Sequence, residues 1–267
     1  MIDAKKFRII YEPQGRATEY VPGGLACNLA VGCPHGCLYC YGPGAMRKTR
    51  ETFHAGAVPT KDCLAKLARD AEDMQAAGDE RMTLFSFATD PYPVGQPAMQ
   101  ALTRAGLAIM AYYERPFTVL TKGGWAELDF NLYTPWRDVF ATSIVWSDDL
   151  DGLEWEPYAG PVPGRWTALR EAGSLDIGTW ISVEPVIDPA QALDVIRRAA
   201  DEGVGHVKIG PLNHHPLAKT IDYAQFGEDL AKVLEETGID YYLKHDLRPY
   251  MPEGFACSTI ETEEDQP

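Results

Sequence analysis

The sequence predicts an α/β protein with a parallel sheet wrapped by helices, and three observations support this prediction. Short apolar segments alternate with amphipathic segments six times or slightly more along the 267 residues, as strands do with the helices that cover them. The apolar segments are often β-branched, which is typical of strands buried on both faces. Polar or Gly/Pro clusters follow five of them in succession, at residues 33–40, 89–90, 122, 182–184 and 208–213. These clusters would all lie at the carboxyl ends of the strands, which form one rim of the sheet. In parallel α/β barrels this rim carries the active site, so we expect a barrel-like fold with its site there.

Length and composition are those of one globular domain. A chain of 267 residues with 45% hydrophobic and 10% aromatic residues can bury one substantial core. The sequence contains no internal repeat and no sign of a second domain. We therefore expect an N-terminal extension over residues 1–25, a core over residues 26–245, and a C-terminal tail with an acidic end over residues 246–267.

The first elements are delimited by glycine, proline and capping residues. In the N-terminal extension, apolar and polar residues alternate only weakly. The extension ends at a Pro-Gly-Gly run. The first core strand is expected over residues 26–31, leading into a loop with three cysteines and then a long linker over residues 41–59. Thr60 is expected to cap a helix over residues 61–77, where apolar residues recur at helical spacing. Gly78 ends that helix.

The later elements follow the same logic. Polar residues, glycine or proline stop each strand abruptly. The segment 146–163 has no clear periodicity and is expected to be irregular. Strands are expected at residues 82–88, 117–121, 139–145, 179–183, 206–209 and 240–243. Helices are expected at residues 97–113, 125–132, 165–172, 190–200 and 223–236.

Charge and cysteine usage limit the class of function. The formal net charge is −15, whereas tight binding to nucleic acid generally needs a cationic surface. The only dense basic run, formed by Arg47, Lys48 and Arg50, is by default a solvated loop, and its position after the cysteine loop leaves contact with an anionic substrate open. No secretory segment and no bilayer-spanning apolar run is present. Six cysteines, three of them clustered, fit a reducing compartment, so we expect a cytoplasmic protein without a membrane partner.

Three of the cysteines, Cys33, Cys37 and Cys40, are spaced to converge in one tight loop. Three thiolates are too few for a structural zinc site, which normally takes four ligands. On a [4Fe–4S] cluster, three would leave one iron open for a substrate or cofactor. A zinc site could instead take Cys27 or His35 as its fourth ligand. We expect Cys27 to be a small buried residue of the preceding strand, and His35 to lie at the surface of the loop.

The C-x3-C-x2-C spacing after a first strand, with the aromatic Tyr39 before the last cysteine, resembles that of the radical S-adenosylmethionine (SAM) superfamily. Residues 11–20, 28–29 and 32–41 look more narrowly like the spore photoproduct lyase-related branch, and the resemblance runs with gaps from Ile10 to about Lys122. It implies a partial (βα)6 TIM-like barrel of the radical SAM type. It also implies a [4Fe–4S] cluster that cleaves SAM reductively, so that a 5′-deoxyadenosyl radical takes hydrogen from an unidentified substrate, and an electron donor such as flavodoxin or ferredoxin.

The resemblance assigns SAM contacts to residues of the rim. Tyr39 stands where the family lines the adenine pocket. Thr89 and Asp90 would accept hydrogen bonds from the methionyl ammonium, although the superfamily's Gly-Gly-Glu motif is absent. The structural alternative is that these two residues form an Asx or ST turn that caps the strand. Lys122 would bind the methionyl carboxylate as a point charge, and solvent exposure is its alternative.

Two further residues complete the candidate set. Ser143 resembles the branch's serine that contacts SAM, and a core serine bonded to the backbone is the competing interpretation. Glu184 follows Ser182 at alternating spacing, which points it into the barrel mouth, where it could receive ribose hydroxyls or substrate.

The sequence departs from the photoproduct lyases at their hydrogen-atom donor, a cysteine near the end of strand two. Residues 87–90 carry no thiol here, Cys63 is expected on a helix and buried, and Cys257 belongs to the tail. We therefore expect shared SAM chemistry without repair of DNA photoproducts. The alternative function is that of a non-catalytic iron–sulfur or zinc-binding protein, which would need a fourth ligand from Cys27, His35 or another chain.

Overall fold

The computed structural model describes residues 2–147, 149–213 and 215–260, so the acidic end of the expected tail lies outside it. Its centre is an eight-stranded sheet in the order β1-β2-β5-β6-β7-β8-β9-β10. Strands β2 to β10 of this sheet run parallel, and β1 joins β2 antiparallel. The strands are β1 (Ile10–Tyr11), β2 (Leu25–Cys27), β5 (Thr83–Phe85), β6 (Phe117–Thr121), β7 (Val139–Ser143), β8 (Gly178–Val186), β9 (His206–Pro211) and β10 (Asp240–Leu243).

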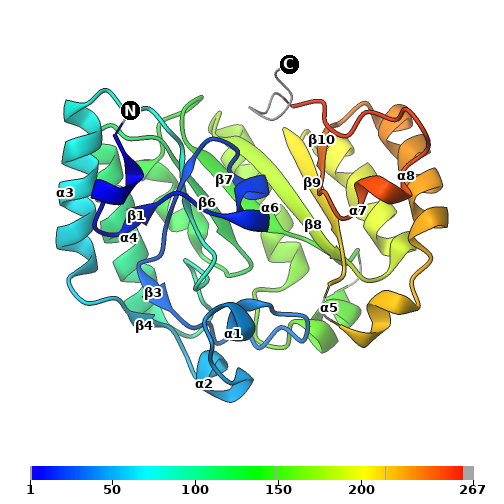
Figure 1. Cartoon of the computed structure of the whole chain (residues 1–267), viewed down its shortest axis with the longest axis horizontal. Coiled ribbons are helices and arrows are strands. Elements are labelled where there is room, and N and C mark those ends of the chain that lie inside the picture. Colours follow the sequence, from blue (N-terminus) through cyan, green and yellow to red (C-terminus); the bar gives the residue numbers. More distant parts are fainter. Residues whose placement is uncertain (1, 148, 214, 261–267) are drawn as a thin grey trace.

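Helices lie along the outside of the curved sheet (Figure 1). The sheet stays open, with β1 and β10 at its two edges, which confirms the expected partial barrel. The long helices are α3 (Cys63–Ala76), α4 (Pro97–Tyr112), α6 (Val162–Ser174), α7 (Pro189–Asp201) and α8 (Tyr223–Thr237). The 3-10 helices are η1 (Ala4–Lys6), η2 (Gly15–Tyr20), η3 (Ala126–Leu132), η4 (Pro216–Lys219) and η5 (Arg248–Tyr250).

The apolar pattern of the sequence explains this layering. All five residues of β6 are buried, as expected of a strand covered on both faces. On α3, the residues Leu67, Ala71 and Met74 recur at helical spacing and are fully buried against the sheet. Because the strands are parallel, their carboxyl ends share one edge, and the loops that carry the candidate site residues meet there (Figure 1).

A buried carboxylate on α3 helps to fasten the N-terminal segment to the core. Asp70, on α3, is fully buried and accepts hydrogen bonds from the backbone N–H groups of Arg8, Ile9 and Ile10. Backbone donors of an edge segment are thereby satisfied without water. This anchor places β1 beside β2 and brings η2 over the sheet.

The expected first strand is two separate strands. It leaves the sheet after Cys27, and β3 (Ala30–Val31) pairs antiparallel with β4 (Val58–Pro59). The reason lies at Asn28, whose side chain accepts from the N–H of Ala88 at 2.8 Å and donates to the hydroxyl of Tyr11 at 2.6 Å. Where the backbone pairing of β2 ends, the side chain of Asn28 therefore makes the hydrogen bonds to the segments on both sides.

Other boundaries also differ from the prediction. The segment 146–163, expected to be irregular, contains α5 (Asp149–Trp155), and the linker contains α1 (Gly42–Ala45) and α2 (Arg50–His54). The helix expected from residue 61 begins at Cys63, with Asp62 and not Thr60 at its N-cap. The helix expected over residues 125–132 is the 3-10 helix η3. The helices α1, α2 and α5 are not predicted because they are too short for a helical apolar period to be recognised.

Candidate cofactor and active site

One cavity of about 320 Å³ opens at the carboxyl edge of the parallel strands. All nine residues that the sequence singled out line it, although they come from five different loops and strands. They are Cys33, Cys37, Tyr39, Cys40, Thr89, Asp90, Lys122, Ser143 and Glu184. The structure therefore brings together every candidate site residue.

The cysteine loop folds tightly because two of its glycines have positive φ. Gly32 has φ 101° and Gly36 has φ 69°. A Cβ on Gly32 would lie 2.3 Å from the carbonyl oxygen of Gly56, so no other residue fits there without moving the backbone. The loop turns back at these points and presents its three thiols to the cavity.

The three thiols of the loop are free and largely enclosed. Burial raises the pKa of Cys33 well above its usual value, raises that of Cys37 to about 12, and raises that of Cys40. Such thiols stay protonated near neutral pH unless a metal displaces the proton. The loop thus offers three metal-ligating sulfurs inside one cavity.

The short helix α2 supports the backbone of all three cysteines. The N–H of Cys33 donates to the carbonyl of Phe53 at 3.0 Å, and Nδ1 of His54 lies 2.9 Å from the carbonyl oxygen of Cys33. The guanidinium of Arg50 donates to the carbonyl oxygens of Cys37 at 2.6 Å and Cys40 at 3.4 Å. A segment expected to be only a linker therefore holds the cysteine loop from behind.

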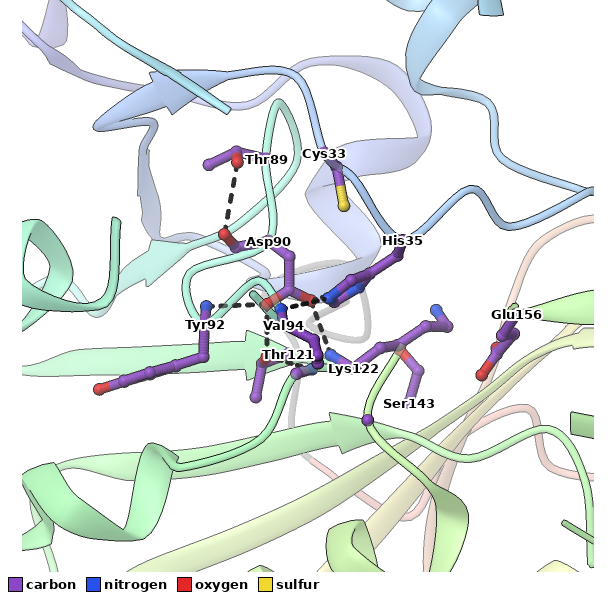
Figure 2. Close-up of polar contacts among 12 residues, drawn as sticks. Cys33, His35, Thr89, Asp90, Tyr92, Val94, Thr121, Lys122, Ser143 and Glu156 are labelled. Atoms are coloured by element: carbon purple, nitrogen blue, oxygen red, sulfur yellow. Dashed lines mark hydrogen bonds and ion pairs between the residues drawn. The ribbon is translucent and has the colours of Figure 1, made fainter. Parts of the chain in front are cut away.

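Asp90 connects three neighbouring loops with its carboxylate (Figure 2). Its Oδ1 accepts from the N–H of Tyr92 at 2.8 Å and from the hydroxyl of Thr121 at 2.6 Å. Its Oδ2 accepts from the backbone N–H of Lys122 at 2.7 Å. The Asx turn that the sequence left as an alternative is present, and the same carboxylate also lines the cavity. Thr89 similarly donates its hydroxyl to the carbonyl of Gly32 at 2.6 Å.

His35 is buried, contrary to the expected surface position. Only 1% of it is exposed, because its ring extends from the cysteine loop to Asp90, whose Oδ2 is 3.6 Å from its Nδ1 (Figure 2). Its Nε2 accepts from the N–H of Val94 at 3.2 Å, which assigns the proton to Nδ1. Burial lowers the pKa of His35, against the opposing effect of Asp90, so a neutral ring links the two loops.

Tyr39 is held by an ion pair that the sequence did not indicate. Its hydroxyl donates to Glu156, which is fully buried and paired with the equally enclosed Arg165. Burial alone would raise the pKa of Glu156, but Arg165 and Lys122 hold it below its usual value. Arg165 also donates to the carbonyl of Ser143 at 2.8 Å. Glu156 lies in a segment without periodicity, where nothing in the sequence separates it from a surface carboxylate.

Lys122 follows β6 and Ser143 is the last residue of β7, and both line the same cavity as the cysteines. Nζ of Lys122 lies 5.4 Å from the centre of the Tyr39 ring, within the range of a cation–π contact. Ser143, at the end of β7, is 5% exposed and faces the same cavity. A cation, a hydroxyl and an aromatic ring thus surround the space beside the three thiols.

Glu184 is reached by residues of the N-terminal segment. Its Oε2 accepts from the hydroxyl of Tyr20 and lies 3.6 Å from Nζ of the buried Lys244, while Arg16 approaches Oε1 at 3.7 Å. Arg16 and Tyr20 themselves line the cavity. Sequence reasoning missed both as site residues, although they belong to the motif at residues 11–20 that the family resemblance had marked.

The other three cysteines lie elsewhere. Cys27 is buried in β2 and Cys63 is buried at the start of α3, as expected. Cys257 follows β10 and is not among the cavity residues. Within the described ranges, no group of three or more His, Cys, Asp and Glu side chains converges closely enough for a single metal ion.

Comparison with known proteins addresses the fold. A spore photoproduct lyase mutant with bound AdoMet and dinucleoside spore photoproduct superposes with a TM-score of 0.59 and 15% identity, over 85% of this chain and 72% of that one. SuiB of Streptococcus suis bound to S-adenosylmethionine gives a TM-score of 0.62 and 10% identity, over 90% of this chain and 51% of SuiB. The fold is that of the radical SAM enzymes. The resemblance drawn from the cysteine motif is thereby confirmed at the level of the fold.

Sequence comparison adds one relative of undescribed activity. The chain is 23% identical over 226 residues to the uncharacterized protein ORF301 of Acidianus two-tailed virus, covering 76% of this chain and 72% of that protein. No protein-family model matches the chain. Among the described residues, no helix is long and apolar enough to cross a membrane.

Proposed function

We propose that this chain is a radical SAM enzyme that holds a [4Fe–4S] cluster through Cys33, Cys37 and Cys40 and binds SAM in the same cavity. The observation that carries the proposal is the convergence of the cysteine loop and all the candidate SAM contacts on one cavity of a fold shared with radical SAM enzymes. When bound, the reduced cluster supplies the electron that splits SAM and yields a 5′-deoxyadenosyl radical, which takes hydrogen from the substrate.

The donor set fits a cluster. Thiolates are the usual ligands of iron–sulfur clusters, and a cubane needs its ligand sulfurs farther apart than a single ion does. Three free thiols line one cavity, which suits a cubane with one open iron, whereas a structural zinc site takes four ligands. His35, a candidate fourth zinc ligand, uses its Nε2 to accept from Val94 and directs its Nδ1 proton towards Asp90.

The chain's own residues would bind and orient SAM. Lys122 supplies the cation for the methionyl carboxylate, and Thr89 with Asp90 supplies acceptors for the ammonium. Asp90 also fixes the backbone of Lys122, so one carboxylate positions both contacts. Ser143 and Glu184 offer a hydroxyl and a carboxylate for the ribose or for the substrate.

The partners that we propose follow from this chemistry. A cluster of this kind needs a one-electron donor, for which a flavodoxin or ferredoxin is suitable, and free clustered thiols favour the reducing cytoplasm. The dinucleoside photoproduct bound by the photoproduct lyase is not proposed as the substrate here. Among the described residues, the cluster cysteines are the only thiols that line the cavity.

One assay tests the proposal. The protein is reconstituted anaerobically with iron and sulfide, then mixed with dithionite and SAM, and 5′-deoxyadenosine is measured. We expect product from the wild type and from Cys63→Ala, and none from Cys33→Ala. A protein that binds and reduces its cluster but leaves SAM intact would support the alternative, a non-catalytic iron–sulfur protein. Tight zinc binding without iron uptake would overturn the proposal as well.

A further inference from the structure

The loop between α1 and α2 is basic in an otherwise acidic protein. It carries Arg47 and Lys48, and Arg50 follows as the first residue of α2; we call these three residues the basic loop, while the whole chain has a net charge of −15. Arg47 and Arg50 are exposed and Lys48 is half-buried. Figure 1 shows α1 and α2 projecting beyond the edge of the sheet. The positive charge is therefore presented to solvent at one end of the molecule.

This charge lies directly behind the cysteine loop. Arg50 donates to the carbonyl oxygens of Cys37 and Cys40, and the following residues of α2 hold the backbone of Cys33. Phe53 packs so closely on Gly42 that a Cβ there would lie 2.5 Å from its ring, which locks α1 on α2. The basic loop and the three cysteines thus form one rigid unit.

The basic loop does not contribute to the cavity wall. None of Arg47, Lys48 and Arg50 is among the residues that line it, although their neighbours Tyr41 and Phe53 are. A surface that bound the substrate would have to contribute to this cavity. Outside the cavity, the guanidinium of Arg50 contacts the cysteine loop directly, at the carbonyl oxygens of Cys37 and Cys40.

We propose that the basic loop is the docking surface for a small acidic electron-transfer protein. This inference rests on the proposed function. One electron passes from the reduced flavin of a flavodoxin to the cluster held by Cys33, Cys37 and Cys40; the flavin is oxidised by one electron and the cluster is reduced by one. The basic loop attracts the partner's acidic surface, which raises the rate of productive encounter. The donor approaches from behind the cysteine loop, so the cavity stays free for SAM and substrate.

The test variant is Arg47→Glu/Lys48→Glu. Neither side chain is needed for the hydrogen bonds that hold the cysteines, which come from Arg50, Phe53 and His54. Arg47 has φ 51°, a conformation that costs glutamate no more than arginine. The matched control is Arg69→Glu/Arg197→Glu, which makes the same change in net charge on α3 and α7 at exposed positions.

Cluster reduction by flavodoxin hydroquinone is followed by stopped-flow absorbance and normalised to cluster content. At about 0.01 M ionic strength, where charges act over about 30 Å, we expect the test variant to be reduced on the order of tenfold more slowly than the wild type and the control. At about 1 M salt we expect the three proteins to be reduced at the same rate, because screening shortens the range of charge–charge interactions to about 3 Å. With saturating dithionite, all three should form 5′-deoxyadenosine at the same rate.

The outcomes separate the two proposals. Wild-type protein that forms no 5′-deoxyadenosine with dithionite overturns the proposed function itself. If dithionite supports turnover, two results would overturn the docking surface alone. One is that flavodoxin reduces the cluster of the test variant as fast as that of the wild type at low salt. The other is that flavodoxin cannot reduce the wild type. A test variant that is equally slow with dithionite has a defect that does not depend on the protein partner, which also overturns the inference.

Discussion

Single residues in this site serve two purposes at once. Asp90 lines the cavity and also accepts from Tyr92, Thr121 and the backbone of Lys122. Its carboxylate therefore has both oxygens occupied before SAM arrives. Any loss of SAM binding on its substitution will combine a lost contact with a displaced loop, whereas the Lys122 side chain lies over the Tyr39 ring and acts through its charge on Glu156.

Replacing Cys33, Cys37 or Cys40 with alanine should abolish the iron–sulfur absorbance after anaerobic reconstitution. Only these three thiols share one loop and one cavity, and a cluster that loses one of three ligands is not retained. Alanine at Cys27, Cys63 or Cys257 should leave the absorbance intact. A full cluster in any of the first three variants would contradict the assignment.

Lys122→Ala should weaken SAM binding about ten- to a hundredfold in the cluster-loaded protein. A charge-assisted contact contributes about 1.5–3 kcal/mol, which corresponds to that range of affinity. Anaerobic calorimetric titration with SAM measures it, with the exposed Lys61→Ala as control. Asp90→Ala should weaken SAM binding as well and also lower the stability of the apo-protein. Wild-type dissociation constants in Lys122→Ala and Asp90→Ala would show that these residues do not bind SAM.

Among the elements, the segment from α5 to α6 determines how rigidly the cysteine loop is held. The N–H of Leu38 donates to the carbonyl of Trp155 at 2.9 Å, and the N–H of Tyr158 donates to that of His35 at 3.2 Å. Glu156 adds its bond to Tyr39 between these two. The cysteine loop is thus fixed on one side by α2 and on the other by residues 155–158.

Arg165→Met should destabilise the protein by about 3–5 kcal/mol, because removal of one partner leaves the buried carboxylate of Glu156 unpaired. Urea unfolding of the apo-protein measures the loss. The double variant Glu156→Gln/Arg165→Met should recover part of it, since no charge is then buried. The control is Arg197→Ala, which breaks an exposed pair with Asp194 and should cost less than about 1 kcal/mol. A similarly small cost for Arg165→Met would show that the pair is dispensable.

For the molecule as a whole, charge and cavity lining together argue against polymeric DNA as the substrate. The net charge of −15 opposes approach to a polyanion. At the end of β5 the cavity presents Phe87 and Thr89, and a hydroxyl O–H bond is too strong to donate a hydrogen atom readily. Both features oppose repair of DNA, and both are compatible with cleavage of SAM.

The reconstituted protein, given SAM and reductant, should therefore cleave SAM without repairing DNA that contains thymine photoproducts. Chromatography of the digested DNA measures restored thymine, with spore photoproduct lyase as the positive control. Restoration of thymine by this chain would contradict the prediction. If that activity disappeared in Cys257→Ala, the tail cysteine would be the hydrogen donor.

Local sequence was sufficient for much of this molecule. Apolar period and strand-ending residues predicted the parallel α/β fold, with β6 and β10 at their observed bounds. The rim at the carboxyl ends of the strands marked residues such as Lys122 and Glu184 as site residues, because parallel strands bring their ends to one edge whatever their order. The cysteine spacing predicted a three-thiol site, since three ligands within one short loop need no distant partner.

Tertiary structure alone decided which residues support that site. Asn28 ends the first strand with side-chain bonds to Ala88 and Tyr11, which are 60 and 17 residues away. His35 is buried because Asp90 and Val94 pack on it, and Glu156 reaches Tyr39 across 117 residues. Such partners are set by the packing of separate elements, and no local pattern encodes them. Local periodicity determines the elements and the rim, whereas long-range contacts determine how the rim is held in place.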